Sequence, residues 1–221
     1  MKTVVAIYTA LALVEDTKKL FAEIIPDCRL INLVDDSLIP DVMNAGQVTG
    51  SVARRLLDYY RAAEEAGADI ILNTCSSVGE VADIGRRVAS VPIIKIDDAM
   101  TAQAVELGKT IGVIATVATT LGPTVRLVRT QAQKLDKDIK IVEGLAGSAF
   151  QALLAGRPEE HDAILLQTAK DLAAQVDVIV LAQGSMARMQ AKLAAETGKP
   201  VLASPRLAVE AVRDMLKGAM Q

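Results

Sequence analysis

The sequence is poor in the residues that most often form cross-links or relay protons. Its 221 residues contain two cysteines, one histidine and no tryptophan, and aromatic residues make up 2% of the chain. Two cysteines, Cys28 and Cys75, cannot build the disulfide framework of a small secreted domain, so we expect reduced thiols. The single histidine, His161, lies in a charged segment where we expect it to be solvated. A Ser-His-Asp or Cys-His relay is therefore disfavoured.

Long apolar runs and blocks of like charge are also lacking. The apolar run at the N-terminus, Thr3 to Tyr8, is too short for a signal-peptide core and is typical of a first strand. No other run is long enough to span a bilayer. The formal net charge is -3, from interspersed acidic and basic residues, so the chain has no basic footprint for nucleic acid or an anionic membrane. We expect a cytoplasmic protein that binds neither.

No motif for a metal ion or a nucleotide is present. A metal site needs several ligands at known spacings, whereas the acidic pairs Asp35-Asp36 and Asp97-Asp98 lack companions, so we expect them in solvated loops. The glycines match neither a phosphate-binding loop nor a dinucleotide fingerprint. The sequence therefore predicts a protein that works without a metal or a cofactor.

Apolar residues are abundant, at 51% of the chain, and they fall into alternating strand-like and helix-like segments. Eight short runs rich in β-branched residues predict strands: Thr3 to Tyr8, Arg29 to Leu33, Asp69 to Asn73, Pro92 to Ile96, Thr110 to Ala115, Ile139 to Val142, Asp177 to Leu181 and Pro200 to Leu202. Longer stretches between them have helical spacing: Thr17 to Ile25, Val52 to Ala66, Val125 to Leu135, Ala163 to Ala174 and Leu207 to Leu216. Strands that alternate with helices predict an α/β fold with parallel sheets.

The chain also repeats itself. The segment around Asp69 resembles the segment around Asp177, at an offset of 108 positions, and the starts of the two halves, Lys2 and Lys109, match at an offset of 107. Such a repeat predicts two pseudo-symmetric lobes, each a four-stranded parallel sheet flanked by helices. We expect the helix after Ser204 to pack back on the first lobe. The first lobe then comprises residues 1-98 plus 205-221, the second comprises residues 99-204, and the active site lies in the inter-lobe cleft.

Hydroxyl, thiol and amide groups gather at the predicted carboxyl ends of the strands, a set that suits a small carboxylate. Tyr8 is the aromatic residue there that could flank a ring. Cys75 follows a buried strand and precedes Ser76 and Ser77 at a helix start, where the helix dipole lowers the pKa of a thiol. We therefore predict that Cys75 is the catalytic group and that Cys28, away from this edge, is structural. The candidate substrate-binding residues are Thr9, Asn73, Thr74, Ser76, Ser77, Thr116, Thr119, Thr120, Gln183, Gly184 and Ser185.

Three of these segments resemble one known family. Asn73 to Cys75, Ile111 to Thr116 and Val180 to Ala187 are together similar to the aspartate/glutamate/hydantoin racemase superfamily, over nearly the whole chain. The resemblance implies a cofactor-independent racemase or isomerase that acts at a carbon next to a carboxylate or carbonyl, with one cysteine after the third strand of each lobe. Cys75 matches the first of these positions, and Gln183 stands at the second. An amide does not exchange a proton at neutral pH, so a symmetric two-thiol racemisation is not available.

Three functions remain open at this point. A racemase would use Cys75 on one face of the carbon and water or a hydroxyl such as Ser185 on the other. A one-thiol lyase would resemble the arylmalonate decarboxylases, in which one cysteine protonates an enediolate, although those enzymes keep the cysteine of the second lobe. A small-molecule binding protein would keep the fold without turnover. The resemblance and the prevalence of two-fold homo-oligomers also lead us to expect a homodimer.

Overall fold

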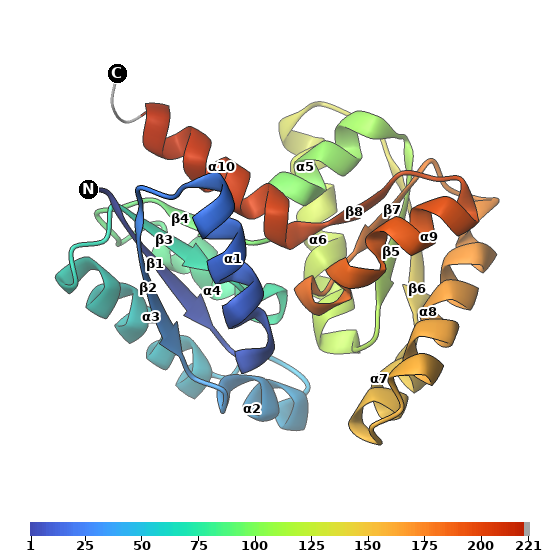
Figure 1. Ribbon diagram of the computed structural model, residues 1–221, viewed down its shortest axis with the longest axis horizontal. Coiled ribbons are helices and arrows are strands. Elements are labelled where there is room, and N and C mark those ends of the chain that lie inside the picture. The colour runs from blue at the N-terminus through green and yellow to red at the C-terminus, as the bar shows by residue number, and fades with distance from the viewer. Residues whose placement is uncertain (219–221) are drawn as a thin grey trace. The chain divides into compact units, whose positions relative to one another are not determined.

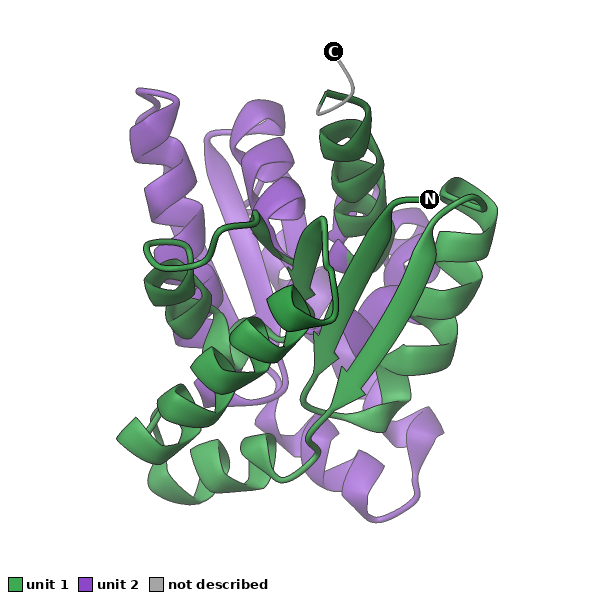
Figure 2. Cartoon of the chain, turned by 90° about the vertical axis from the view of Figure 1, so that its left-hand side faces the viewer, with its two compact units in different colours: residues 1–96, 205–221 green, residues 97–204 purple. Residues whose placement is uncertain are grey.

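The computed structural model describes residues 1–218 and divides into two compact units. Unit 1 runs from Met1 to Ile96 and takes in the chain again from Pro205, and unit 2 runs from Asp97 to Ser204 (Figure 2). The predicted first boundary, after residue 98, lies two residues beyond the observed one, and the second coincides with it.

Unit 1 is a four-stranded parallel sheet in the order β2-β1-β3-β4, with helices on both faces (Figure 1). Its elements are β1 (Thr3–Tyr8), the 3-10 helix η1 (Leu11–Leu13), α1 (Val14–Ile24), β2 (Arg29–Val34), α2 (Leu38–Ala45), α3 (Gly50–Glu65), β3 (Ile70–Asn73), the 3-10 helix η2 (Ser76–Val78), α4 (Gly79–Gly85), β4 (Ile93–Lys95) and α10 (Ser204–Gly218).

The two faces of this sheet take alternate residues of β1, because successive side chains of a strand point to opposite sides. Val5 and Ile7 pack into a core with α2, α3 and α4. Val4, Ala6 and Tyr8 pack into a second core with α1 and α10. Burial on both faces explains why the strand reads as a continuous apolar run.

Unit 2 repeats this plan with a parallel sheet in the order β6-β5-β7-β8. Its elements are α5 (Asp98–Leu107), β5 (Thr110–Ala115), α6 (Ala118–Lys134), β6 (Lys140–Leu145), α7 (Gly147–Leu154), α8 (Pro158–Ala173), β7 (Val178–Leu181), the 3-10 helix η3 (Gly184–Met189), α9 (Gln190–Thr197) and β8 (Val201–Ala203). All eight predicted strands are present, and the predicted fold class of two pseudo-symmetric four-stranded α/β lobes is confirmed.

The repeat extends to a matching contact at the start of each sheet. The Asp69 carboxylate accepts a hydrogen bond from the backbone N–H of Thr3, at 2.8 Å, and the Asp177 carboxylate accepts one from Thr110, also at 2.8 Å. In both units the aspartate stands just before the third strand and fixes the first residue of the first strand. The two halves of the repeat, offset by 108 positions, therefore share this hydrogen bond as well as their fold.

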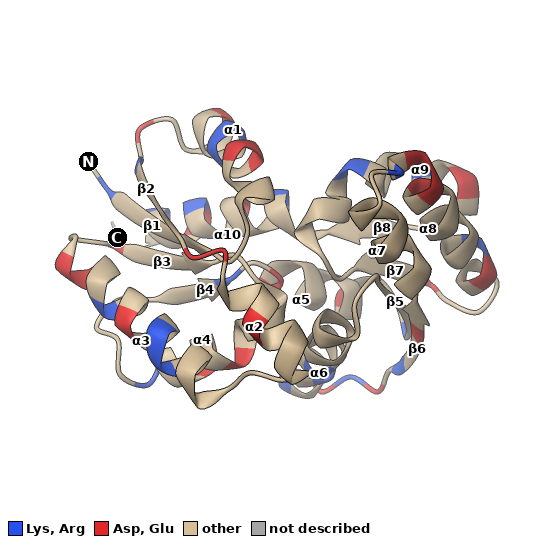
Figure 3. Ribbon diagram, turned by 90° about the horizontal axis from the view of Figure 1, so that it is seen from below, with Lys and Arg blue, Asp and Glu red and all other residues tan. Residues whose placement is uncertain are grey.

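Charged side chains lie mainly on the helices and loops and are of mixed sign, whereas the strands carry few (Figure 3). In residues 1–218, no helix is both long enough and apolar enough to cross a membrane. The distribution is that of sheets buried on both faces.

Candidate active site

Cys75 lies at the carboxyl edge of the unit 1 sheet, between the end of β3 and the start of η2. Its side chain is half-buried, whereas every other residue from 70 to 79 is buried. Ser76 and Ser77, both predicted to bind substrate, are among these buried neighbours, with exposed fractions of 7% and 5%. The thiol is therefore the side chain that this buried segment offers to a ligand.

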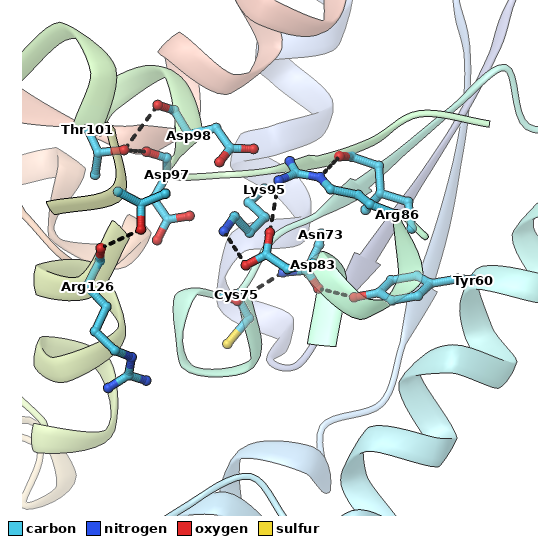
Figure 4. Close-up of polar contacts among 12 residues, drawn as sticks. Tyr60, Asn73, Cys75, Asp83, Arg86, Lys95, Asp97, Asp98, Thr101 and Arg126 are labelled. Atoms are coloured by element: carbon cyan, nitrogen blue, oxygen red, sulfur yellow. Dashed lines mark hydrogen bonds and ion pairs between the residues drawn. The ribbon is translucent and has the colours of Figure 1, made fainter. Parts of the chain in front are cut away.

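Two of the predicted substrate-binding residues hold the Cys75 loop in place. The Asn73 amide accepts a hydrogen bond from the Tyr60 hydroxyl, at 3.1 Å, and donates one to the backbone carbonyl of Cys75, at 3.0 Å (Figure 4). The Thr74 hydroxyl donates to the carbonyl of Ile7 in β1, at 2.9 Å. Because Asn73 and Thr74 are buried and bonded to the protein, their side chains position the loop.

A charge network that includes one buried lysine lies at the same edge and was missed by the sequence analysis, which found only neutral groups at the strand ends. Lys95, the last residue of β4, pairs in register with Asn73 and is 5% exposed. Its ammonium donates to Asp83 of α4 at 2.9 Å, and Asp83 also accepts from Arg86 at 3.0 Å (Figure 4). The sequence indicated this network only through Lys95, a lysine that stands within the apolar run before Ile96.

The expectation of solvated acidic pairs is wrong for one member of each pair. Asp35, after β2, accepts hydrogen bonds from Ser37 and Tyr59 and pairs with Arg55. Burial raises the pKa of Asp35, but the hydrogen bonds from Ser37 and Tyr59 outweigh it and hold the pKa below its ordinary value. Asp97, which precedes α5, is 2% exposed. Within residues 1–218, no three His, Cys, Asp or Glu side chains are grouped so that they could hold a metal ion.

Residues at the end of β1 behave in different ways. Thr9 lies at the carboxyl edge, where it was predicted, and is 4% exposed. Tyr8 is fully buried, and its hydroxyl donates to Asn32 at 2.9 Å. Desolvation by burial raises the pKa of Tyr8 to about 12. The prediction that Tyr8 could flank a bound ring is therefore wrong, because strand alternation turns this side chain into the core.

The carboxyl edge of the unit 2 sheet carries the remaining predicted residues. Gln183 follows β7, and its side-chain oxygen accepts hydrogen bonds from the backbone N–H and the hydroxyl of Thr116, at 2.6 and 3.0 Å. Thr119 and Thr120 lie in the first turn of α6, the first half-buried and the second buried. Gly184 and Ser185 begin η3, where Ser185 is exposed.

His161 is buried rather than solvated, so the expectation of a surface histidine is wrong. It is 4% exposed, and its Nδ1 lies 2.8 Å from the Asp162 carboxylate. Arg188 of η3 bonds to the same carboxylate through both terminal nitrogens. The pKa of Asp162 falls because of the Arg188 hydrogen bond in the first place. The histidine thus belongs to a group of polar contacts that links α8 to η3, the segment that follows Gln183.

Cys28 lies before β2, at the amino edge of the unit 1 sheet, as the sequence predicts. Its thiol is 3.6 Å from the carbonyl of Arg29, and desolvation by burial raises its pKa. A thiol held in the protonated form is a poor nucleophile and a poor base. The two cysteines therefore lie in different chemical settings.

The protein repeats one parallel sheet twice. The first sheet carries a half-buried thiol at its carboxyl edge, and the second carries an amide at the equivalent place. This arrangement defines a two-lobed α/β protein of racemase type. The family model described as Asp/Glu/Hydantoin racemase matches residues 4–212. The chain belongs to this family and is a racemase-type enzyme.

Solved structures of racemases share the fold. The glutamate racemase of Francisella tularensis, in complex with D-glutamate, gives a TM-score of 0.75 at 15% identity, over 99% of this chain and 82% of that one. The aspartate racemase of Picrophilus torridus gives 0.75 at 17% identity, over 98% and 95%. The allantoin racemase of Klebsiella pneumoniae gives 0.67 at 17% identity, over 99% and 89%. A search of curated proteins by sequence found no match.

Proposed function

We propose that this racemase-type enzyme acts, without a cofactor, at a carbon next to the carboxylate or carbonyl of a small acid, with Cys75 as the group that exchanges the proton. The position of Cys75 carries the proposal. It is the half-buried thiol at the carboxyl edge of a buried parallel sheet, which is where such sheets bind their ligands. Cys28 stands at the opposite edge with its pKa raised.

A thiol suits this reaction because the proton next to a carboxylate is weakly acidic and its removal leaves an enediolate. A cysteine near neutral pH can take up and return a proton, provided that it is held in place and that donors face the developing charge. The bonds from Asn73 and Thr74 supply the first condition, since they fix the backbone on both sides of Cys75. Racemisation then needs a second proton donor on the other face of the carbon, and the proposal assigns this role to water or to a hydroxyl such as that of Ser185.

One observation favours a second candidate, a decarboxylating lyase. The position equivalent to Cys75 in the other half of the repeat is Gln183, which cannot exchange a proton at neutral pH. A reaction that forms an enediolate by loss of carbon dioxide needs only one acid. Cys75 alone would then protonate the intermediate, on one face.

The two reactions separate in heavy water. Purified protein is incubated with a panel of small 2-substituted acids, amino acids and 2-substituted malonates. NMR follows deuterium at the α-carbon, chiral chromatography follows configuration, and carbon dioxide release is recorded. Deuterium with a scrambled centre and no carbon loss supports racemisation. One deuterated enantiomer with carbon dioxide supports the lyase, and no reaction across the panel would argue against both.

The two cysteines provide a matched pair of variants for this assay. We expect Cys75→Ser to lose at least about a thousandfold in kcat, because a hydroxyl is a far weaker acid and base at neutral pH. Cys28→Ser should keep most of the activity and change stability only. Full activity of the Cys75→Ser variant would rule out the proposed chemistry.

A further inference from the structure

The orientation of the Gln183 amide is fixed by its partner. The backbone N–H of Thr116 can only donate a hydrogen bond, and it lies 2.6 Å from one end of the Gln183 side chain. That end must therefore be the carbonyl oxygen, Oε1, which also accepts from the Thr116 hydroxyl at 3.0 Å. The other end is the NH2 group, Nε2. Within residues 1–218, no protein acceptor is bonded to this NH2 group, and the side chain is half-buried.

The backbone around Gln183 is held as firmly as its side chain. The N–H of Ala182 donates to the carbonyl of Ile114 at 2.9 Å, and the Gln183 carbonyl accepts from the N–H of Met186 at 3.0 Å. Thr116 itself is 3% exposed. The NH2 group is therefore a pair of N–H donors whose position is set before any ligand arrives.

We propose that Gln183 Nε2 donates a hydrogen bond to a carboxylate oxygen of the substrate, and that Thr116 is the residue that positions it. A fixed neutral donor stabilises an anionic oxygen without a cost of reorientation when charge builds up. The same geometry excludes Gln183 as the second base, because the oxygen that could accept a proton is already bonded twice. This inference rests on the proposed function in one respect, namely that the substrate carries a carboxylate.

The repeat sharpens this assignment. Gln183 occupies the place that Cys75 occupies in unit 1, at an offset of 108 positions. The family pattern would place a proton-exchanging thiol there, whereas this chain places a donor that never changes protonation. The substitution turns a proton-transfer position into an anion-binding one, so the two halves of the repeat perform different tasks.

The test follows the side-chain amide directly. Protein labelled with 15N-glutamine is titrated with malonate and, separately, with succinate, and the Gln183 signals are assigned by their loss in Gln183→Glu. We expect the Nε2 signal of Gln183 to move on addition of at least one dicarboxylate, and not with malonamide, which has a similar size but no charge. Malonate and succinate that both leave this signal unmoved would overturn the inference.

Matched variants distinguish the role of the Gln183 NH2 group as donor from the role of Thr116 in positioning it. Gln183→Glu keeps an acceptor for the Thr116 N–H but replaces the NH2 group by an anionic oxygen, so the dicarboxylate Kd should rise at least about tenfold. Thr116→Val removes one of the two restraints and should raise the Kd by about threefold, and Thr116→Ser should restore it. Thermal unfolding confirms that each variant is folded. An unchanged Kd in folded Gln183→Glu would also contradict the inference.

The titration is repeated with the Cys75→Ser variant, because the NMR signal reports binding without any turnover. If Cys75→Ser stays active while the Gln183 signal moves, the proposed function fails and the inference stands. If Cys75→Ser is inactive while the signal stays fixed, the inference fails and the proposed function stands.

Discussion

At the scale of single residues, Asn73 links the hydrophobic core to the thiol. Its amide is bonded on one side to the Tyr60 hydroxyl of α3 and on the other to the carbonyl of Cys75. The contact with Tyr60 is shielded from water, since Asn73 is 1% exposed and Tyr60 is 2% exposed. Desolvation by burial, first of all, raises the pKa of Tyr60, so its hydroxyl remains a donor throughout the physiological range.

Removal of the Asn73 amide should therefore destabilise the fold more than removal of the Tyr60 hydroxyl. We expect Asn73→Ala to lower the free energy of unfolding by about 2–3 kcal/mol, because the buried Tyr60 hydroxyl and the Cys75 carbonyl both lose their partner. Tyr60→Phe should cost about 1 kcal/mol and leave the bond to Cys75 in place. Urea unfolding of both variants measures the difference. An Asn73→Ala variant as stable as Tyr60→Phe would show that the bond to Cys75 does not hold the loop.

Sequence could identify which positions matter here but not where each side chain points. Cys75 and Gln183 follow from the repeat and from the family resemblance, because both depend on the order of residues. The positioning roles of Asn73 and Thr74 depend on partners more than ten residues away, and His161 contacts Arg188 of another element. Such long-range pairings leave no local pattern to read.

At the scale of the elements, two aspartates fix the strand starts. Asp69 and Asp177 have lowered pKa values, caused for Asp69 first by the Lys2 hydrogen bond and for Asp177 first by the backbone N–H of Thr110. A depressed pKa in the folded state means that the stabilisation is fully present above the ordinary carboxyl pKa, about 4. It is lost as the pH falls through the lower, folded-state value.

We therefore expect Asp177→Asn to unfold at a lower temperature than the wild type at pH 7, with the difference shrinking below about pH 4. Asp58→Asn, which removes an exposed ion pair with Arg61, should have little effect at either pH. Thermal melts across this pH range make the comparison. A difference between Asp177→Asn and wild type that is constant with pH would contradict the assigned role of the carboxylate.

The helix α4, which follows the Cys75 loop, is held in place by its close approach to α3 at Gly85. A Cβ at Gly85 would lie 2.7 Å from the Tyr60 ring and 2.9 Å from Ile93. Overpacking of this kind costs about 1–3 kcal/mol, against a gain of about 1 kcal/mol in helix propensity. We expect Gly85→Ala to lose up to about 2 kcal/mol in net stability, while Gly147→Ala, which has no atom within 4 Å, should be neutral or stabilising. Denaturant unfolding that ranks the two variants the other way would contradict this packing.

The strands were easier to predict than the helices. The inner strands β1, β3, β5 and β7 are largely apolar runs, a pattern that is typical of burial on both faces. The helices α2, α5, α7 and α9 were not predicted, because each has ten residues or fewer and so contains too few turns for a clear period. The helix α6 begins at Ala118 rather than at the predicted Val125, since the helix continues through Gly122 and Pro123.

At the scale of the whole molecule, the chain passes from unit 1 to unit 2 and back. Unit 2 is one continuous segment, whereas unit 1 needs its last helix, which contributes Val209, Val212 and Leu216 to the core with α1. We expect a fragment of residues 97–204 to unfold cooperatively by circular dichroism, and residues 1–96 to do so only when 205–221 are joined by a linker. Cooperative unfolding of residues 1–96 alone would show that α10 is dispensable for unit 1.

Proton exchange at the α-carbon, measured in heavy water for the wild type, Cys75→Ser and Cys28→Ser, tests the central claim most directly. The claim predicts deuterium incorporation into at least one small acid by the wild type and by Cys28→Ser, and its loss in a folded Cys75→Ser variant. Deuterium incorporation by Cys75→Ser at the wild-type rate would contradict it.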